Sequence, residues 1–205
     1  MKKEIKNLIF DAGGVIFESG WDKVKKDILK KYGFSIFLYS DYPKKVSKKF
    51  KGVSVGKVSF KDVIKYLSKG KTMNKVEIII QDYKKSYNKH QKINKKLLKL
   101  IKKLKKLYNL FCLTDTNDIH LEINRENGNF SDFKKVYASC EIGVKKPYKK
   151  AFKMVLKDNK IKPAETIFID NTPKNINSAK KLGFNTILFR NNKQLIKDLK
   201  KLKIT

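Results

Sequence analysis

Asn7-Leu-Ile-Phe-Asp-Ala-Gly-Gly14 is the stretch that decides the fold of this chain. Its first four residues form a mostly apolar run, which stops abruptly at Asp11 and a glycine-rich turn. A short apolar run bounded by a turn predicts a strand that is buried in a parallel sheet. Because ligands of open parallel sheets bind beyond the carboxyl ends of the strands, we expect Asp11 to lie at a functional edge.

Four further segments of the chain repeat this strand pattern. They are Leu110 to Leu113, Val136 to Cys140, Thr166 to Ile169 and Thr186 to Phe189. Helical periods alternate with them from about residue 91 onward. The helical periods cover an apolar stripe from Ile93 to Leu107 and the segments Tyr148 to Lys157, Pro173 to Leu182 and Gln194 to Leu202. This alternation predicts an α/β fold with a doubly wound, mostly parallel sheet.

The stretch from residue 18 to residue 90 has a different character. It contains no clear strand that ends in a carboxylate, and its periodicity predicts helices around 21–31, 42–50, 59–68 and 74–88. The stretch is far too long for a simple crossover between strands. We therefore predict a core formed by residues 1–17 plus 91–205, with residues 18–90 as an inserted helical cap. The aromatic residues predicted to pack inside the cap are Trp21, Phe34, Phe37, Tyr39 and Tyr42.

The composition bears on the possible partners. Of the 205 residues, 40% are hydrophobic, which is enough for a buried core. The formal net charge is +31, yet only Arg125 and Arg190 are arginines among the 50 basic residues, and the lysines are spread over nearly every amphipathic segment. Specific nucleic-acid recognition favours the bidentate arginine fork. We therefore expect no specific nucleic-acid partner, only a salt-sensitive attraction to polyanions.

No apolar run approaches the roughly 20 residues of a membrane span, and the N-terminus lacks the pattern of a signal peptide. We expect a cytoplasmic protein with no membrane partner, in which Cys112 and Cys140 stay reduced. The sequence makes no prediction of the oligomeric state.

The polar residues that end the predicted strands should meet at one edge of the sheet. They are Asp11, Thr114, Asp170 and a lysine that follows the Val136 to Cys140 segment. Hard carboxylate oxygens are ligands for Mg²⁺, while a hydroxyl and an ammonium can hold phosphate oxygens. This set of side chains predicts a site for a phosphate group held with a divalent cation.

Four segments around these residues resemble, in order, the four motifs of haloacid dehalogenase-like (HAD-like) hydrolases. The segments are Leu8 to Phe17 (LIFDAGGVIF), Leu113 to His120 (LTDTNDIH), Ser139 to Pro147 (SCEIGVKKP) and Ile167 to Asn175 (IFIDNTPKN). The predicted helical insertion stands where subfamily I members carry their cap. The resemblance implies a Rossmann-like core with an α-helical cap, and a phosphatase for a small phosphorylated metabolite, with a sugar phosphate favoured.

The resemblance also implies a role for each matching residue. Asp11 would attack the phosphorus and form an aspartyl-phosphate, which water then hydrolyses. A Mg²⁺ cofactor would be bound by the carboxylates of Asp11 and Asp170 and by the main-chain carbonyl of Gly13. Thr114 and Lys146 would bind and orient the phosphoryl oxygens.

The chain departs from the family pattern at two positions. Most phosphatases of the superfamily have a second aspartate, the general acid, where this chain has Gly13. The branch that acts on α-D-glucose 1-phosphate resembles this chain here, and an anomeric leaving group needs less help from an acid. Asp115 is predicted to line the substrate pocket, or else to replace the missing proton donor. Asn171 stands where a second aspartate is common, and it could hold a metal-bound water.

Two other functions stay open at this point. A relative without catalytic activity could bind polyanions. A 2-haloacid dehalogenase would share Asp11 and Lys146, but it would not need the acidic Asp170, and the aromatic residue that such enzymes have at position 13 is absent. His120 could line the pocket or begin a helix.

Overall fold

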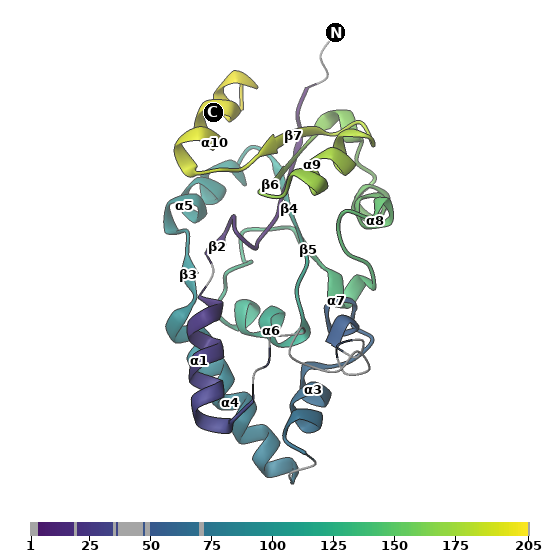
Figure 1. Cartoon of the computed structure of the whole chain (residues 1–205). Helices are drawn as coiled ribbons and strands as arrows, with labels where there is room; N and C mark the ends of the chain where they lie inside the picture. Colours follow the sequence, from purple (N-terminus) through teal and green to yellow (C-terminus); the bar gives the residue numbers. More distant parts are fainter. Residues whose placement is uncertain are drawn as a thin grey trace.

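The computed structural model describes residues 4–18, 20–34, 36, 47, 50–69 and 72–204 (Figure 1). A five-stranded sheet in the order β5-β4-β1-β6-β7 lies at its centre, and each neighbouring pair of strands is parallel. The strands are β1 (Asn7–Phe10), β4 (Asn109–Thr114), β5 (Lys135–Ala138), β6 (Thr166–Asp170) and β7 (Asn185–Leu188). The five predicted strands are confirmed. The predicted end of one was wrong, because Ser139 and Cys140 begin the short helix α7 (Ser139–Ile142).

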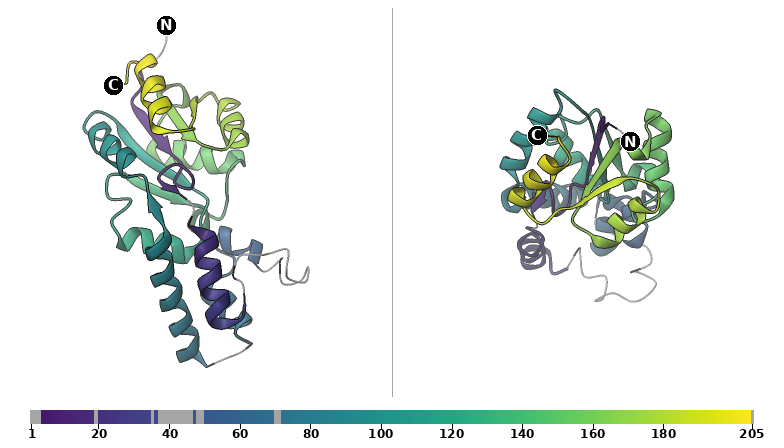
Figure 2. Two further views of the ribbon diagram at one scale, coloured as in Figure 1. Left: turned by 60° about the vertical axis from the view of Figure 1, so that its left-hand side comes forward. Right: turned by 90° about the horizontal axis from the view of Figure 1, so that it is seen from above.

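Helices cover both faces of the sheet, as the views in Figure 2 show. Helices α5 (Lys95–Leu104) and α10 (Asn192–Lys201) pack on the face that contains Leu8 and Phe10. Helices α8 (Lys149–Asn159) and α9 (Pro173–Lys180) pack on the opposite face, which contains Ile9. Successive side chains of a strand point to opposite faces, so β1 is buried along its whole length. The prediction of a doubly wound α/β sheet is confirmed.

The insertion is helical in its described parts. It contains α1 (Trp21–Tyr32), the 3₁₀ turn η2 (Val53–Val55), α3 (Phe60–Leu67) and α4 (Met73–His90). Most of the predicted helix at 42–50 lies outside the described residues, as do Phe37, Tyr39 and Tyr42.

The chain leaves and re-enters the core through a two-stranded ribbon that the sequence did not predict. Strand β2 (Phe17–Glu18) pairs antiparallel with β3 (Lys92–Ile93). Ile93 was wrongly assigned to the following helix. The Asn94 side chain accepts a hydrogen bond from the Leu97 amide, so α5 begins only after Asn94.

Helix α6 (Asp118–Glu126) joins the core to the cap, although it comes from the second half of the sequence. Its residues Ile119 and Ile123 belong to the same hydrophobic cluster as Val24 and Phe60 of the cap helices. The Asp118 carboxylate accepts the Phe60 amide at 3.0 and 3.1 Å, which ties the start of α3 to α6. The division of the chain into core and cap therefore stays a prediction, since one apolar cluster crosses the proposed boundary.

Both cysteines are free; Cys112 is buried and Cys140 is half-buried. Across the described ranges, no helix is both long and apolar enough to span a membrane.

Candidate active site

Three neighbouring strands bring their terminal polar residues to one edge of the sheet. Asp11 follows β1, and Thr114 and Asp170 end β4 and β6, the strands on either side of β1. All three side chains are buried, with residue exposures of 6%, 3% and 0%. The backbone N–H of Asp11 donates to the Ile169 carbonyl at 2.8 Å, which fixes the aspartate against β6. The structure thus brings together the carboxylates and the hydroxyl that the sequence predicted.

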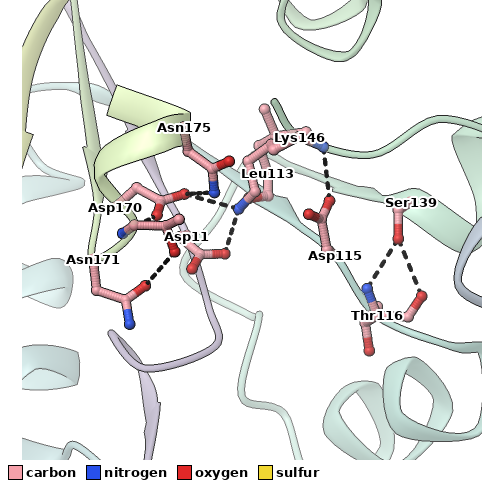
Figure 3. A network of polar contacts seen from close by, with 10 residues as sticks. Asp11, Leu113, Asp115, Thr116, Ser139, Lys146, Asp170, Asn171 and Asn175 are labelled. Carbon is pink, nitrogen blue, oxygen red and sulfur yellow. Dashed lines mark hydrogen bonds and ion pairs between the residues drawn. The ribbon is translucent and has the colours of Figure 1, made fainter. Parts of the chain in front are cut away.

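Lys146 completes this group from the loop after α7 (Figure 3). Its Nζ lies 2.5 Å from Asp11 Oδ1 and 3.0 Å from Asp170 Oδ2, and it donates to the Leu113 carbonyl at 2.8 Å. The backbone N–H of Lys146 donates to Asp115 Oδ1 at 3.0 Å. The lysine is only 4% exposed, so its ammonium is held between the two aspartates.

The electrostatics of the group leave an excess of negative charge. Burial raises the pKa of Asp11 to about 6, against the lowering effect of Lys146, and the nearby Asp170 raises it further. Burial alone would lower the pKa of Lys146, but the carboxylates of Asp11, Asp170 and Asp115 together raise it. Asp115 keeps an exposed surface, yet the surrounding protein restricts the hydration of its carboxylate and raises its pKa. Three carboxylates therefore face one ammonium.

The two buried carboxylates at this edge fit a hard divalent cation. The Asp11 carboxylate lines the cavity, and Lys146 contacts its Oδ1. Asp170 accepts from the Thr172 amide at 2.7 Å and from Asn175 Nδ2 at 3.0 Å, which orients its carboxylate. Within the described ranges no three His, Cys, Asp or Glu side chains cluster as a metal site. A cation here would need the main-chain carbonyl of Gly13 and water as well, which is how Mg²⁺ is commonly held.

The two glycines of the turn after Asp11 differ in the space available for a side chain. Gly14 has a φ of +74°, and a Cβ added there would lie 2.1 Å from Asn171 Nδ2. Only glycine fits this position without strain. A Cβ added at Gly13 would meet nothing within 4 Å, and its φ lies outside the positive region. The side of Gly13 is thus open toward the cavity that it lines.

A cavity of about 650 Å³ extends from this edge toward the cap. On the core side it is lined by Asp11, Gly13, Thr114, Asp115, Lys146 and Asn171. On the cap side it is lined by residues of α1, η2 and α4, among them Trp21, Lys25, Ser54 and Tyr87, and by Gln91 just after α4. His120 both lies within α6 and lines the cavity.

Sequence reasoning missed several residues of this site. Thr116 and Ser139 exchange hydrogen bonds of 2.9 and 3.1 Å, which join the loop after β4 to the start of α7. Asn175 orients Asp170, and its position in the first turn of the helix that follows the strand could have suggested this. Tyr87 lies on α4, whose periodicity predicts only a packed face, and Gln91 follows the last residue of that helix, so nothing local distinguished them.

Comparisons with known proteins agree with this geometry. A family model for haloacid dehalogenase-like hydrolases matches residues 8–189. The D-ribitol-5-phosphate phosphatase of Bacteroides thetaiotaomicron is 27% identical over 195 residues, which cover 89% of this chain and 90% of that protein.

Two solved structures extend the comparison. A HAD family enzyme from Bacteroides thetaiotaomicron, in complex with magnesium and inorganic phosphate, has a TM-score of 0.74 at 28% identity, and the match covers 91% of this chain and 94% of that one. A predicted HAD-like family hydrolase from Porphyromonas gingivalis has a TM-score of 0.74 at 27% identity, with 98% of both chains covered. These relatives do not test the resemblance to the α-D-glucose 1-phosphate branch, which stays a prediction. Since the family model spans most of its length, the chain belongs to the haloacid dehalogenase-like hydrolase family.

Proposed function

We propose that this protein is a Mg²⁺-dependent phosphatase that hydrolyses a small phosphomonoester, with a sugar phosphate favoured. The observation that carries the proposal is the environment of the Asp11 carboxylate. The carboxylate is buried, lies 2.5 Å from the ammonium of Lys146 and belongs to a side chain that lines the cavity. The names of the relatives, a sugar-alcohol phosphatase and an enzyme in complex with magnesium and phosphate, support the same reaction.

In this mechanism Asp11 attacks the phosphorus of the ester. A bond forms between a carboxylate oxygen and phosphorus while the bond to the leaving oxygen breaks, and water later cleaves the aspartyl-phosphate. Lys146 and the hydroxyl of Thr114 hold the phosphoryl oxygens as their charge redistributes. A Mg²⁺ ion bound by Asp11, Asp170 and the carbonyl of Gly13 would supply positive charge to the phosphoryl group. Asp115 lines the cavity beside these groups and is assigned to substrate binding.

The lack of an acidic side chain at Gly13 limits which leaving groups can depart rapidly. No side chain stands where most phosphatases of the superfamily carry their general acid, and general acids typically contribute about 10²–10⁴-fold to rate. Substrates with a less basic leaving oxygen, such as an anomeric oxygen or a phenolate, lose less from this absence. We therefore expect turnover to depend strongly on the leaving group.

The test is the release of phosphate from p-nitrophenyl phosphate and from a panel of sugar and nucleotide phosphates, with and without Mg²⁺. We expect Mg²⁺-dependent turnover that falls at least about 10³-fold in Asp11→Asn, because the amide cannot act as the nucleophile. The proposal fails if the wild-type protein turns over no member of the panel faster than Asp11→Asn. Halide release from a 2-haloacid, or heparin binding without turnover, would then favour the two alternatives.

A further inference from the structure

The hydroxyl of Tyr87, on the cap side of the cavity, has an unusual set of partners. Tyr87 belongs to α4 and is only 3% exposed. Its ring stacks on His120, with centroids 4.7 Å apart, and lies against Trp21 at 5.3 Å. All three residues line the cavity. The ring is therefore fixed in place, and the position of its hydroxyl is fixed with it.

Two amide groups donate hydrogen bonds to the Tyr87 hydroxyl oxygen. Asn124 Nδ2 lies 3.0 Å from this oxygen, and Gln91 Nε2 lies 2.6 Å from it. The orientation of the Asn124 amide follows from its other contacts. Its nitrogen also donates to the His120 carbonyl at 2.8 Å, and its oxygen accepts from Asn129 at 2.9 Å.

These contacts leave the hydroxyl proton of Tyr87 without an acceptor. A phenol has two lone pairs and one O–H, and with Gln91 Nε2 facing it both lone pairs are occupied by amide donors. No described residue then accepts the remaining O–H. If the Gln91 amide turns over, the O–H donates to Oε1 and the Gln91 NH₂ becomes the donor of the pair without an acceptor. A buried donor without an acceptor is costly and calls for a partner. Burial raises the pKa of Tyr87 to about 12, so the group stays a donor at neutral pH.

Gln91 supplies a complementary group at the same place. Its Nε2 points to Tyr87, while its Oε1 has no donor among the described residues, and Gln91 lines the cavity. A donor and an acceptor side by side match an alcohol, which can accept from one and donate to the other. A carboxylate, a phosphate or an aromatic ring would satisfy only part of this pair.

We propose that Tyr87, together with Gln91, determines specificity by binding a hydroxyl group of the substrate, so that the cavity selects phosphorylated polyols and sugars. The proposal rests on the proposed phosphatase function, because it assumes that the phosphate group occupies the Asp11 edge of the same cavity.

The test is Tyr87→Phe, which removes the hydroxyl and keeps the stacked ring. The measured quantity is kcat/KM for a five-carbon alditol phosphate divided by kcat/KM for p-nitrophenyl phosphate, which carries no alcohol. We expect this ratio to fall about tenfold in Tyr87→Phe, as loss of one hydrogen bond to a substrate hydroxyl predicts. The matched control is Tyr83→Phe, on the same helix. The hydroxyl of Tyr83 contacts His120 Nε2 at 2.5 Å, and its removal should leave the ratio unchanged.

A binding experiment separates this inference from the proposed reaction. In the Asp11→Asn background, calorimetry with the same alditol phosphate should give an affinity about tenfold weaker when Tyr87→Phe is added. If the wild-type protein has no turnover but this difference in binding appears, only the proposed reaction fails. An unchanged ratio in turnover, or equal binding by the two proteins, overturns the assignment of Tyr87.

Discussion

Two walls enclose the cavity, and they differ in how their polar groups are stabilised. The core wall consists of strand ends, where Asp11 and Asp170 are buried around the ammonium of Lys146. The cap wall around His120 consists of helix faces, where Tyr87 and its amide partners are neutral. Buried charges are costly unless they are paired, while neutral groups need only hydrogen bonds. Changes to the core wall should therefore have larger effects than changes to the cap wall.

Removing the ammonium gives the largest expected effect. Lys146→Met leaves Asp11 and Asp170 buried without their counter-ion. We expect turnover to fall about 10³-fold, as for the loss of a charged group that stabilises the transition state. The free energy of unfolding at pH 7 should fall by at least about 3 kcal/mol in urea titrations.

The neighbouring lysine provides the control for this change. Lys145 is exposed, so Lys145→Met should stay within about 0.5 kcal/mol of the wild type and retain turnover. If Lys145→Met and Lys146→Met lose the same stability and turnover, the ion pairs of Lys146 are not what stabilises the core wall.

Restoring an acid to the core wall should give the next largest effect. A side chain at position 13 has open space around its Cβ, so Gly13→Asp should fold normally. The new carboxyl would lie near Asp11, where like charge favours the protonated form that a general acid requires. We expect kcat for an alkyl phosphate to rise at least about tenfold, with little change for p-nitrophenyl phosphate, whose phenolate leaves without a proton.

Gly13→Asn is the matched variant for this experiment, since it has the same shape and carries no acidic proton. An equal gain in both variants would attribute the effect to shape and would contradict the role of a missing acid.

The two walls also differ in how far the sequence predicted them. Each carboxylate of the core wall follows an apolar run at the end of a strand, and parallel topology alone places such ends together. Tyr87 lies on α4 and Gln91 directly follows the end of that helix, but a helical period does not distinguish a packed tyrosine from one that binds a substrate. Their partner Asn124 is distant in sequence and lies on α6, a helix that the sequence suggested only as one of two alternatives for His120. The ribbon of β2 and β3 escaped prediction because two-residue strands have no measurable period.

The smallest expected effect concerns the cap wall, where His120 is buried and neutral. Burial lowers its pKa to about 3, whereas an unfolded chain has a histidine pKa of about 6.5. Between these values the unfolded state binds more protons, so the free energy of unfolding falls as the pH drops. From pH 7.5 to 5.5 this single group should remove about 1.3 kcal/mol.

His120→Gln isolates this contribution. Glutamine does not titrate, and its terminal amide can still meet the hydroxyl of Tyr83. Asp11 acts in the opposite direction, because its raised pKa of about 6 makes the folded state bind the extra proton as the pH falls. Both proteins share that contribution, so it cancels in their difference. Urea titrations at several pH values should show the wild type losing about 1.3 kcal/mol relative to His120→Gln between pH 7.5 and 5.5. If the free energies of unfolding of the two proteins change in parallel with pH, His120 takes up its proton in the folded protein as well. The cap wall would then accommodate a buried charge, as the core wall does.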